Sequence, residues 1–312
     1  MEIKNEFGAS RVVVLNVGQE DVDGLLINWD LNDAGEIEYM EKSFIDVVTS
    51  YLPEYSMGYD SKGISQSSIV PLLREAAEGV IKIKKIDTIR DYLNQGIPYD
   101  QWDQEVQEFY NSKGVFSELI LHFLLRDMKE TLPLISKIYF KDSRAVEAHG
   151  FDAVHVTDNT LWLEETKFYM DGKDGIKKLI SDLNNHFNHN YLKEQFVIIS
   201  RALVHNDTLR ESWIQKITNA NRLEEIFSFI KIPLLCIYED PVSDTILDEL
   251  NKGGCAETIY FDHISELKRY FDSKNTFPNK NKVECILMLL PVQSKNRIVS
   301  AMLARIHNMQ HI

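Results

Sequence analysis

The stretch Gly150–Lys167, GFDAVHVTDNTLWLEETK, decides the fold and the chemistry that we expect of this chain. Its centre, Asp158–Asn159, has two residue types that tolerate the left-handed backbone of a two-residue hairpin turn. Counting outward from that turn places Asp152 opposite Glu165, and the two-residue repeat of a strand places Lys167 on the same face. The sequence therefore predicts a β-hairpin that brings two carboxylates and one ammonium group together.

The rest of that hairpin face is apolar, with valine and leucine along both strands. Two opposed carboxylates in such a setting repel each other and lose hydration, and a bound divalent cation removes both penalties. Mg²⁺ prefers carboxylate oxygens, water and substrate phosphate as ligands, and Mn²⁺ is the alternative ion. We therefore predict Asp152 and Glu165 as metal ligands and catalytic acids. Lys167 would hold an attacking water or stabilise charge on a phosphate, so that the site hydrolyses a phosphodiester bond.

A third acid comes from an apolar helix that we predict over Val115–Met128. Glu118 lies there among large apolar side chains, where an unpaired carboxylate is costly. We therefore consider Glu118 a further catalytic and metal-binding residue. Two ordinary interpretations stand beside these predictions: an exposed hairpin face with a surface salt bridge, and a water-exposed position for Glu118 at the edge of the apolar stripe.

After the hairpin, apolar strands alternate with helices, which is typical of an α/β sheet that helices cover on both faces. We expect a mixed central sheet flanked by helices over residues 98–312, and an N-terminal α+β region, a candidate for docking a partner, over residues 1–97. The strands are predicted at Arg11–Val17, Leu25–Asp30, Ile135–Phe140, Asp152–Val156, Leu161–Phe168, Phe196–Ser200, Pro233–Tyr238, Glu257–Phe261 and Lys282–Leu290. The helices are predicted at Ser43–Leu52, Ser68–Ile81, Tyr99–Tyr110, Val115–Met128, Gly175–Leu192, Asp207–Ala220, Arg222–Phe229, Asp244–Lys252, Ile264–Asp272 and Ser294–Met309.

The charge of the chain is unusual for a protein that binds nucleic acid. There are 34 lysines and arginines against 48 aspartates and glutamates, so the formal net charge is −14. Proteins that bind nucleic acid usually present a basic face to the phosphates. Either the positive charge is local and cations neutralise the acidic site, or a partner protein supplies most of the affinity for DNA.

Composition excludes several other classes of protein. No apolar run has the length needed to cross a bilayer, and the polar N-terminus lacks the layout of a signal peptide. The three cysteines, Cys236, Cys255 and Cys285, lie far apart, as expected of reduced thiols in a cytoplasmic protein. His186 and His189 have metal-binding spacing, but no cysteine or acidic cluster nearby in the sequence completes a zinc site, which favours a structural or surface role.

The four candidate residues follow the order of the PD-(D/E)xK nuclease superfamily, which the sequence resembles. That core has a helix with a glutamate, a strand with an aspartate and a strand with (D/E)-x-K, matched here by Glu118, Asp152, Glu165 and Lys167. Phe stands before Asp152 where the literal motif has proline. The segments GVFSELILHFLL, GFDAVHV and LWLEETKFY are also similar to the HamA family of nucleases in Hachiman anti-phage defence, over about residues 100–300.

The resemblance implies a restriction-endonuclease-like core and a Mg²⁺-dependent deoxyribonuclease that acts on DNA. It also implies a partner, because HamA-like proteins work with HamB, a superfamily 2 helicase that restrains the nuclease and senses aberrant DNA. Two alternatives stay open. One is a non-catalytic regulatory or DNA-binding subunit that keeps the nuclease fold, and the other is a repair or restriction nuclease with the same core.

Overall fold

The structure is a computed structural model, and it describes most of the chain with several gaps. The described residues are 12–19, 21–57, 69–80, 88–89, 91–92, 95–97, 101–111, 114–134, 154–187, 192, 212–213, 215–216, 223–254 and 256–312. Asp152 and the strands predicted at Ile135–Phe140 and Phe196–Ser200 lie outside the described residues.

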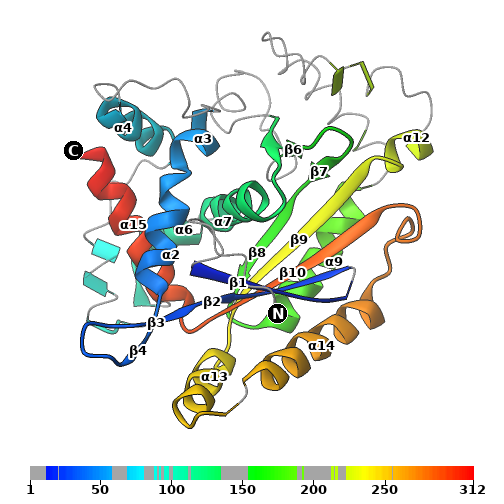
Figure 1. The fold of residues 1–312 in the computed structure, drawn as a ribbon. Coiled ribbons are helices and arrows are strands. Elements are labelled where there is room, and N and C mark those ends of the chain that lie inside the picture. Colours follow the sequence, from blue (N-terminus) through cyan, green and yellow to red (C-terminus); the bar gives the residue numbers. More distant parts are fainter. Residues whose placement is uncertain are drawn as a thin grey trace.

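An eight-stranded sheet forms the centre of the described fold, in the order β1-β2-β10-β9-β7-β6-β5, with β8 also paired to β9 (Figure 1). Two further strands, β3 and β4, form a separate hairpin. The strands are β1 (Val13–Gln19), β2 (Val22–Ile27), β3 (Trp29–Leu31), β4 (Ile37–Tyr39), β5 (Leu132–Pro133), β6 (Val154–Val156), β7 (Leu161–Leu163), β8 (Glu165–Tyr169), β9 (Ile230–Glu239) and β10 (Glu284–Val292).

Parallel pairing occupies the middle of this sheet and antiparallel pairing its two sides. β9 runs parallel to β10, β7 and β8, and β10 runs parallel to β2. β1 is antiparallel to β2, and β5, β6 and β7 are antiparallel to one another in turn. The α/β architecture with a mixed central sheet is thereby confirmed. The division at residue 97 stays a prediction, and the fold adds that β1 and β2 extend the main sheet through β10.

Helices cover both faces of the sheet (Figure 1). α2, α7 and α15 pack on one face, and α9 and α14 pack on the other. The helices are α2 (Glu41–Ser50), α3 (Leu52–Met57), α4 (Ile69–Val80), α6 (Gln104–Asn111), α7 (Gly114–Met128), α9 (Gly172–His186), α12 (Leu223–Phe227), α13 (Val242–Asn251), α14 (Glu257–Lys274) and α15 (Lys295–Gln310). None of the helices in the described part of the chain combines the length and the apolar composition needed to cross a membrane.

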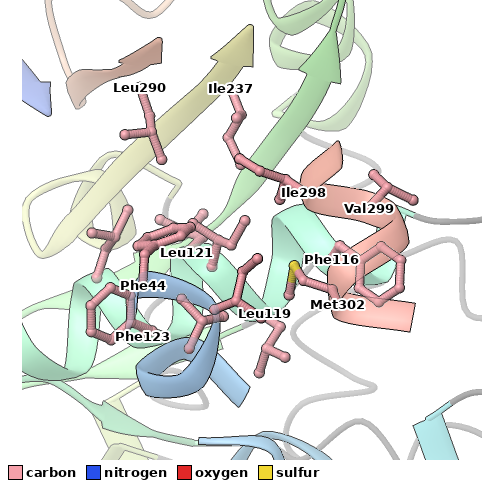
Figure 2. Close-up of a cluster of buried hydrophobic side chains, with 14 of the residues drawn as sticks. Phe44, Phe116, Leu119, Leu121, Phe123, Ile237, Leu290, Ile298, Val299 and Met302 are labelled. Carbon is pink, nitrogen blue, oxygen red and sulfur yellow. The ribbon is translucent and has the colours of Figure 1, made fainter. Parts of the chain in front are cut away.

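The first core lies between the sheet and the layer of α2, α7 and α15 (Figure 2). Phe44 of α2, Leu119 of α7 and Met302 of α15 are all fully or almost fully buried there. Ile237 of β9 and Leu290 of β10 contribute the sheet side of the same cluster. Because α7 is apolar on nearly every side and is enclosed by other elements, it is the central helix of this layer.

The second core lies on the opposite face, under α9 and α14. Leu234 and Cys236 of β9 face this side, whereas Leu235 and Ile237 face the first core, as the alternation of a strand requires. Gly175 lets α9 approach the strand closely, because a Cβ at this position would lie 2.5 Å from the sulfur of Cys236. The close approach fixes the height of α9 above the sheet.

One predicted strand is wrong. Glu257–Phe261 is the first part of α14, not a strand. The buried residues of α14, which include Tyr260, Ile264, Leu267 and Phe271, follow helical spacing and pack on the second core. The alternating letters of ETIYF extend over only five residues, which is too short a window to distinguish a strand from the first turns of a helix.

The cysteines agree with the expectation of reduced thiols where they can be placed. Cys236 is free and fully buried, and Cys285 is free and partly buried. Burial raises the pKa of the Cys285 thiol to about 12, so it stays protonated at neutral pH. Cys255 lies outside the described residues.

Candidate active site

The register of the predicted hairpin is confirmed over the residues that the structure describes. Val156 pairs with Leu161 and Val154 pairs with Leu163. The left-handed turn is wrong, because Glu130 is the one non-glycine residue with positive φ among those described. The amide of Thr160 donates to the hydroxyl of Thr157 at 3.2 Å, and the amide of Thr157 donates to the carbonyl of Thr160 at 2.9 Å. A side-chain hydroxyl thus closes the turn without positive φ.

β7 and β8 are two segments of one interrupted strand that pairs with β9. Trp162 pairs with Lys231 and Glu165 pairs with Leu234, so the offset to β9 is the same on both sides of Glu164. That offset places Pro233, which has no amide hydrogen to donate, opposite the break between the two strands. The side-chain alternation therefore continues unbroken through the break, and Glu165 points to the second core like Leu161 and Leu163.

Glu165 and Lys167 lie on that one face, as the sequence predicts. Glu165 is almost fully buried, with 1% of its surface exposed, and the Lys167 ammonium is 3.9 Å from its Oε2 atom. The nearer partner of Lys167 is Asp182 of α9, whose Oδ2 atom is 2.9 Å from Nζ. Lys178, one turn earlier on the same helix, binds the other oxygen of Asp182 at 2.8 Å. Asp182 is therefore held from two sides by lysines.

His186, at the end of α9, contacts the other oxygen of the Glu165 carboxylate through its Nδ1 atom. An ionised carboxylate only accepts hydrogen bonds, so Nδ1 carries the hydrogen of this bond. The sequence favoured a structural or surface role for His186 because nothing adjacent in the sequence completed a metal site. The missed signal is the spacing of Lys178, Asp182 and His186, which are four residues apart and share one edge of a helix.

Charge alternates along this network from Lys178 through Asp182 and Lys167 to Glu165. Burial tends to raise the pKa of Asp182, but hydrogen bonds from Lys178 and Lys167 outweigh it and hold that pKa below its ordinary value. Asp182 is therefore ionised at neutral pH. The result is a buried carboxylate on β8 whose neighbouring ammonium group is anchored from the helix rather than from the strand.

Glu118 lies on α7, which packs on the other face of the sheet from Glu165. It is 8% exposed, so the structure does not support the water-exposed position at the edge of α7. The hydroxyl of Tyr55 in α3 donates to its Oε2 atom. The preceding residue, Ser117, accepts a hydrogen bond of 2.6 Å from Thr166 of β8. α7 thus contacts the strand of the candidate motif through Ser117, and Glu118 has Tyr55 of α3 as a polar partner.

The described residues test the metal site only in part. No three His, Cys, Asp or Glu side chains among them converge on a point that suits a metal ion. Asp152, the predicted second ligand on the hairpin, lies outside the described residues, and its pairing with Glu165 stays a prediction. The chemistry of Glu165 itself fits Mg²⁺, which takes one or two protein carboxylates and completes its shell with water and phosphate.

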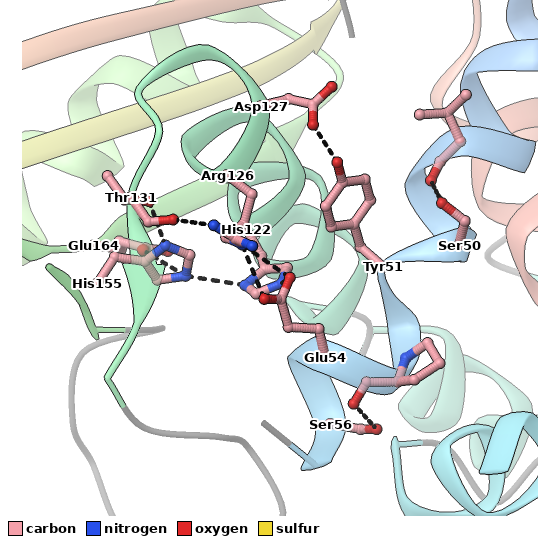
Figure 3. A network of polar contacts seen from close by, with 12 residues as sticks. Ser50, Tyr51, Glu54, Ser56, His122, Arg126, Asp127, Thr131, His155 and Glu164 are labelled. Carbon is pink, nitrogen blue, oxygen red and sulfur yellow. Dashed lines mark hydrogen bonds and ion pairs between the residues drawn. The ribbon is translucent and has the colours of Figure 1, made fainter. Parts of the chain in front are cut away.

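A second polar network lies on the Glu118 side of the sheet (Figure 3). His122 of α7 and His155 of β6 are buried, with 2.9 Å between Nδ1 of the first and Nε2 of the second. His155 also contacts the Thr131 hydroxyl through Nδ1 at 2.7 Å. The other nitrogen of His122 is 3.4 Å from Glu54 of α3. These contacts join α3, α7 and β6 through polar groups.

One set of tautomers is consistent with these contacts. Glu54 can only accept, so His122 carries its hydrogen on Nε2 and offers Nδ1 as an acceptor. His155 then donates from Nε2 to His122 and accepts at Nδ1 from the Thr131 hydroxyl. Burial lowers the pKa of both histidines, in line with neutral rings. Two hydrogen bonds therefore run in one direction, from Thr131 through His155 to His122, and Nε2 of His122 faces Glu54 at 3.4 Å.

Comparison with known proteins places the chain in a family. The family model named HamA matches residues 8–306. A search of curated proteins and a search of solved structures returned no match. The matched residues include all four positions of the candidate motif. Because the match spans nearly all of the 312 residues, the chain belongs to the HamA family, which is associated with Hachiman anti-phage defence.

Proposed function

We propose that the chain is a metal-dependent DNA endonuclease and the effector of a Hachiman defence system. The observation that carries this proposal is the placement of Glu165 and Lys167 on one buried face of β8, 3.9 Å apart. A carboxylate and an ammonium group at this distance, at the end of a hairpin in a mixed sheet, are the parts that phosphodiester hydrolysis needs.

Each residue has a role in the proposed reaction. Asp152 and Glu165 would hold Mg²⁺ or Mn²⁺ from facing strands of the hairpin. Glu118 stays a predicted third acid, but α7 carries it on the opposite face of the sheet from Glu165. When bound, the cation polarises the phosphate and lowers the pKa of a bound water. Lys167 would orient the attacking water or stabilise the charge that develops on the phosphate. Burial of Glu165 excludes bulk water and strengthens these electrostatic interactions.

The proposed partner is a superfamily 2 helicase of the HamB kind, which would restrain the nuclease and deliver DNA to it. Membership of the HamA family supports this proposal. The formal charge of −14 supports it as well, because a chain this acidic repels DNA at long range and benefits from a partner that binds the phosphates. The gene beside this one tests the pairing: a helicase gene supports it, and its absence contradicts it.

A second candidate function is a regulatory or DNA-binding subunit without catalysis. It is favoured by the absence of three converging metal-binding side chains among the described residues, and by the hydrogen bond that holds Glu118 on Tyr55. Both candidates predict the same fold and the same family. They differ in whether the purified protein cleaves DNA when a divalent cation is supplied.

The test is an incubation of supercoiled plasmid with the purified chain, alone and with its helicase partner, in Mg²⁺ and in EDTA. We expect nicked and linear DNA in Mg²⁺ and intact plasmid in EDTA. Asp152→Ala should abolish cutting because it removes a metal ligand. Plasmid that stays intact in every Mg²⁺ sample, with and without the partner, would favour the regulatory subunit.

A further inference from the structure

We propose that Asp182 and His186 of α9 are positioning residues for the site, Asp182 for Lys167 and His186 for Glu165. This inference rests on the proposed nuclease function and extends it to residues outside the four-residue motif. Both side chains come from α9 and lie outside the hairpin. Each binds one member of the Glu165–Lys167 pair directly.

The geometry of α9 explains why these two residues reach the site. Its buried stripe packs on the second core through Ile176, Leu179 and Leu183. Asp182 and His186 are four residues apart on one edge of the same helix, next to that stripe. The edge lies over β8, so both side chains meet the strand at the point where Glu165 and Lys167 emerge.

Asp182 decides where the ammonium group of Lys167 lies. Nζ is 2.9 Å from Asp182 and 3.9 Å from Glu165, so the closer ion pair is the one with the helix. Without the charge of Asp182, Glu165 still attracts the Lys167 ammonium group from 3.9 Å. The lysine would then move onto the metal-binding carboxylate and away from the position where it serves the water or the phosphate. Lys178 fixes the second oxygen of Asp182 and so keeps it in place.

His186 orients the carboxylate of Glu165. The hydrogen on Nδ1 is donated to one carboxylate oxygen, which leaves the other oxygen on the side of Lys167. Hydrogen bonds of this kind orient metal-binding carboxylates, and their removal reduces metal affinity or activity. The side chain of His186 is 31% exposed, so its replacement should leave the folded core intact.

The two roles predict different defects in plasmid cutting measured against Mg²⁺ concentration. Asp182→Asn should lower the cutting rate at saturating Mg²⁺ by about 10-fold or more, because added metal does not return Lys167 to its place. His186→Ala should raise the Mg²⁺ concentration for half-maximal cutting by about 10-fold and keep most of the saturated rate. His186→Asn should restore the wild-type Mg²⁺ requirement, since its amide nitrogen can replace Nδ1 as donor.

Asp174→Asn is the matched control. Asp174 binds Lys177 at 2.7 Å on the same helix, but both side chains are 59% exposed. We expect its cutting rate, its Mg²⁺ requirement and its unfolding temperature to equal those of the wild type. A wild type that cuts, together with Asp182 and His186 variants that behave like this control, would overturn the inference alone. An identical loss of rate in His186→Ala and His186→Asn would also overturn it. A wild type that never cuts would overturn the proposed function itself.

Discussion

Glu164 and Glu165 are adjacent in the sequence, yet their side chains point to opposite faces of the sheet and enter different networks. Glu165 meets His186 and Lys167 on the α9 side. Glu164 is fully buried and lies 3.5 Å from His155 on the α7 side. Strand alternation produces this separation. A substitution in one network can therefore be interpreted without a direct effect on the other.

Glu54 tests the network on the α7 side. The Nε atom of Arg126 is 2.9 Å from both oxygens of Glu54, and His122 is 3.4 Å away. Glu54→Gln keeps the shape but removes the charge that these groups bind, so we expect a loss of about 1–3 kcal/mol in the free energy of unfolding. Urea unfolding measures it. Glu224→Gln, which breaks an exposed pair with Lys282, should leave stability unchanged. Equal stabilities for the two variants would contradict the role of the network.

Among the elements, α9 links the fold to the candidate site. Its N-terminal half is placed by Gly175 against Cys236, and its C-terminal half carries Asp182 and His186. The contact at Gly175 sets how far the helix lies above β9. Because the helix is rigid, this contact also determines where its C-terminal end lies. The distance from Asp182 to Lys167 therefore depends on a residue two turns away.

A substitution at Gly175 tests this dependence. Gly175→Ala places a Cβ 2.5 Å from the sulfur of Cys236, and such overpacking of a core costs about 1–3 kcal/mol of stability. Removing the sulfur in Gly175→Ala/Cys236→Ala relieves the contact, so the double variant should be more stable than the sum of the single changes predicts. Thermal or urea unfolding of the three variants measures the coupling. Strict additivity would show that the close approach does not constrain α9.

The sequence predicted those elements whose pattern is long or strictly alternating. The pairing of Val154 with Leu163 followed from counting, because a strand has a fixed repeat and the turn had one plausible centre. The segment Glu257–Phe261 was wrong because its residues suit either a strand or the start of α14. Tertiary packing on the second core selected the helix.

The sequence predicted only the part of the candidate site that lies within a single strand. Glu165 and Lys167 share a face because they are two residues apart in a strand, which the sequence states directly. Asp182 and His186 were missed because their contacts depend on how α9 is rotated and how high it lies above the sheet. Local sequence patterns do not fix those two quantities. The partner of Glu118 was missed for the same reason, since Tyr55 comes from α3 in the N-terminal region.

At the scale of the whole molecule, the N-terminal region and the core are joined by both backbone and side chains. β2 pairs with β10 in the main sheet, and Glu54 of α3 binds Arg126 of α7. The Arg126 guanidinium also donates to the Thr131 carbonyl at 2.5 Å, just before β5. Residues far apart in the sequence therefore share one buried polar network, which makes the stability of the molecule sensitive to its protonation.

Two histidines of that network and His263 of α14 predict a loss of stability in mild acid. The pKa values of His122, His155 and His263 are lowered in the folded chain, in each case chiefly by burial. In the unfolded chain each returns to about 6.5, so above about pH 7 neither state binds a proton at these rings. Below that pH the unfolded chain takes up protons that the folded chain does not, and stability falls by up to about 1.4 kcal/mol per pH unit for each histidine.

Urea unfolding between about pH 8 and pH 5 measures this change in the free energy of unfolding. We expect a plateau at the alkaline end and a steady fall below about pH 6.5. His155→Gln should reduce the slope, because it removes one of the titrating rings. A stability that rises as the pH falls would contradict the buried neutral histidines.

We propose that Lys167 belongs to a catalytic site on β8, and the rate of plasmid cutting in saturating Mg²⁺ is the measurement that depends on this role. Lys167→Ala should reduce the initial rate by about 100-fold or more, the range typical of losing a group that assists proton transfer or stabilises charge. Lys177→Ala removes an exposed lysine of α9 that pairs with exposed Asp174, and it should cut at the wild-type rate. A Lys167→Ala variant that cuts as fast as Lys177→Ala would show that Lys167 is not a catalytic residue.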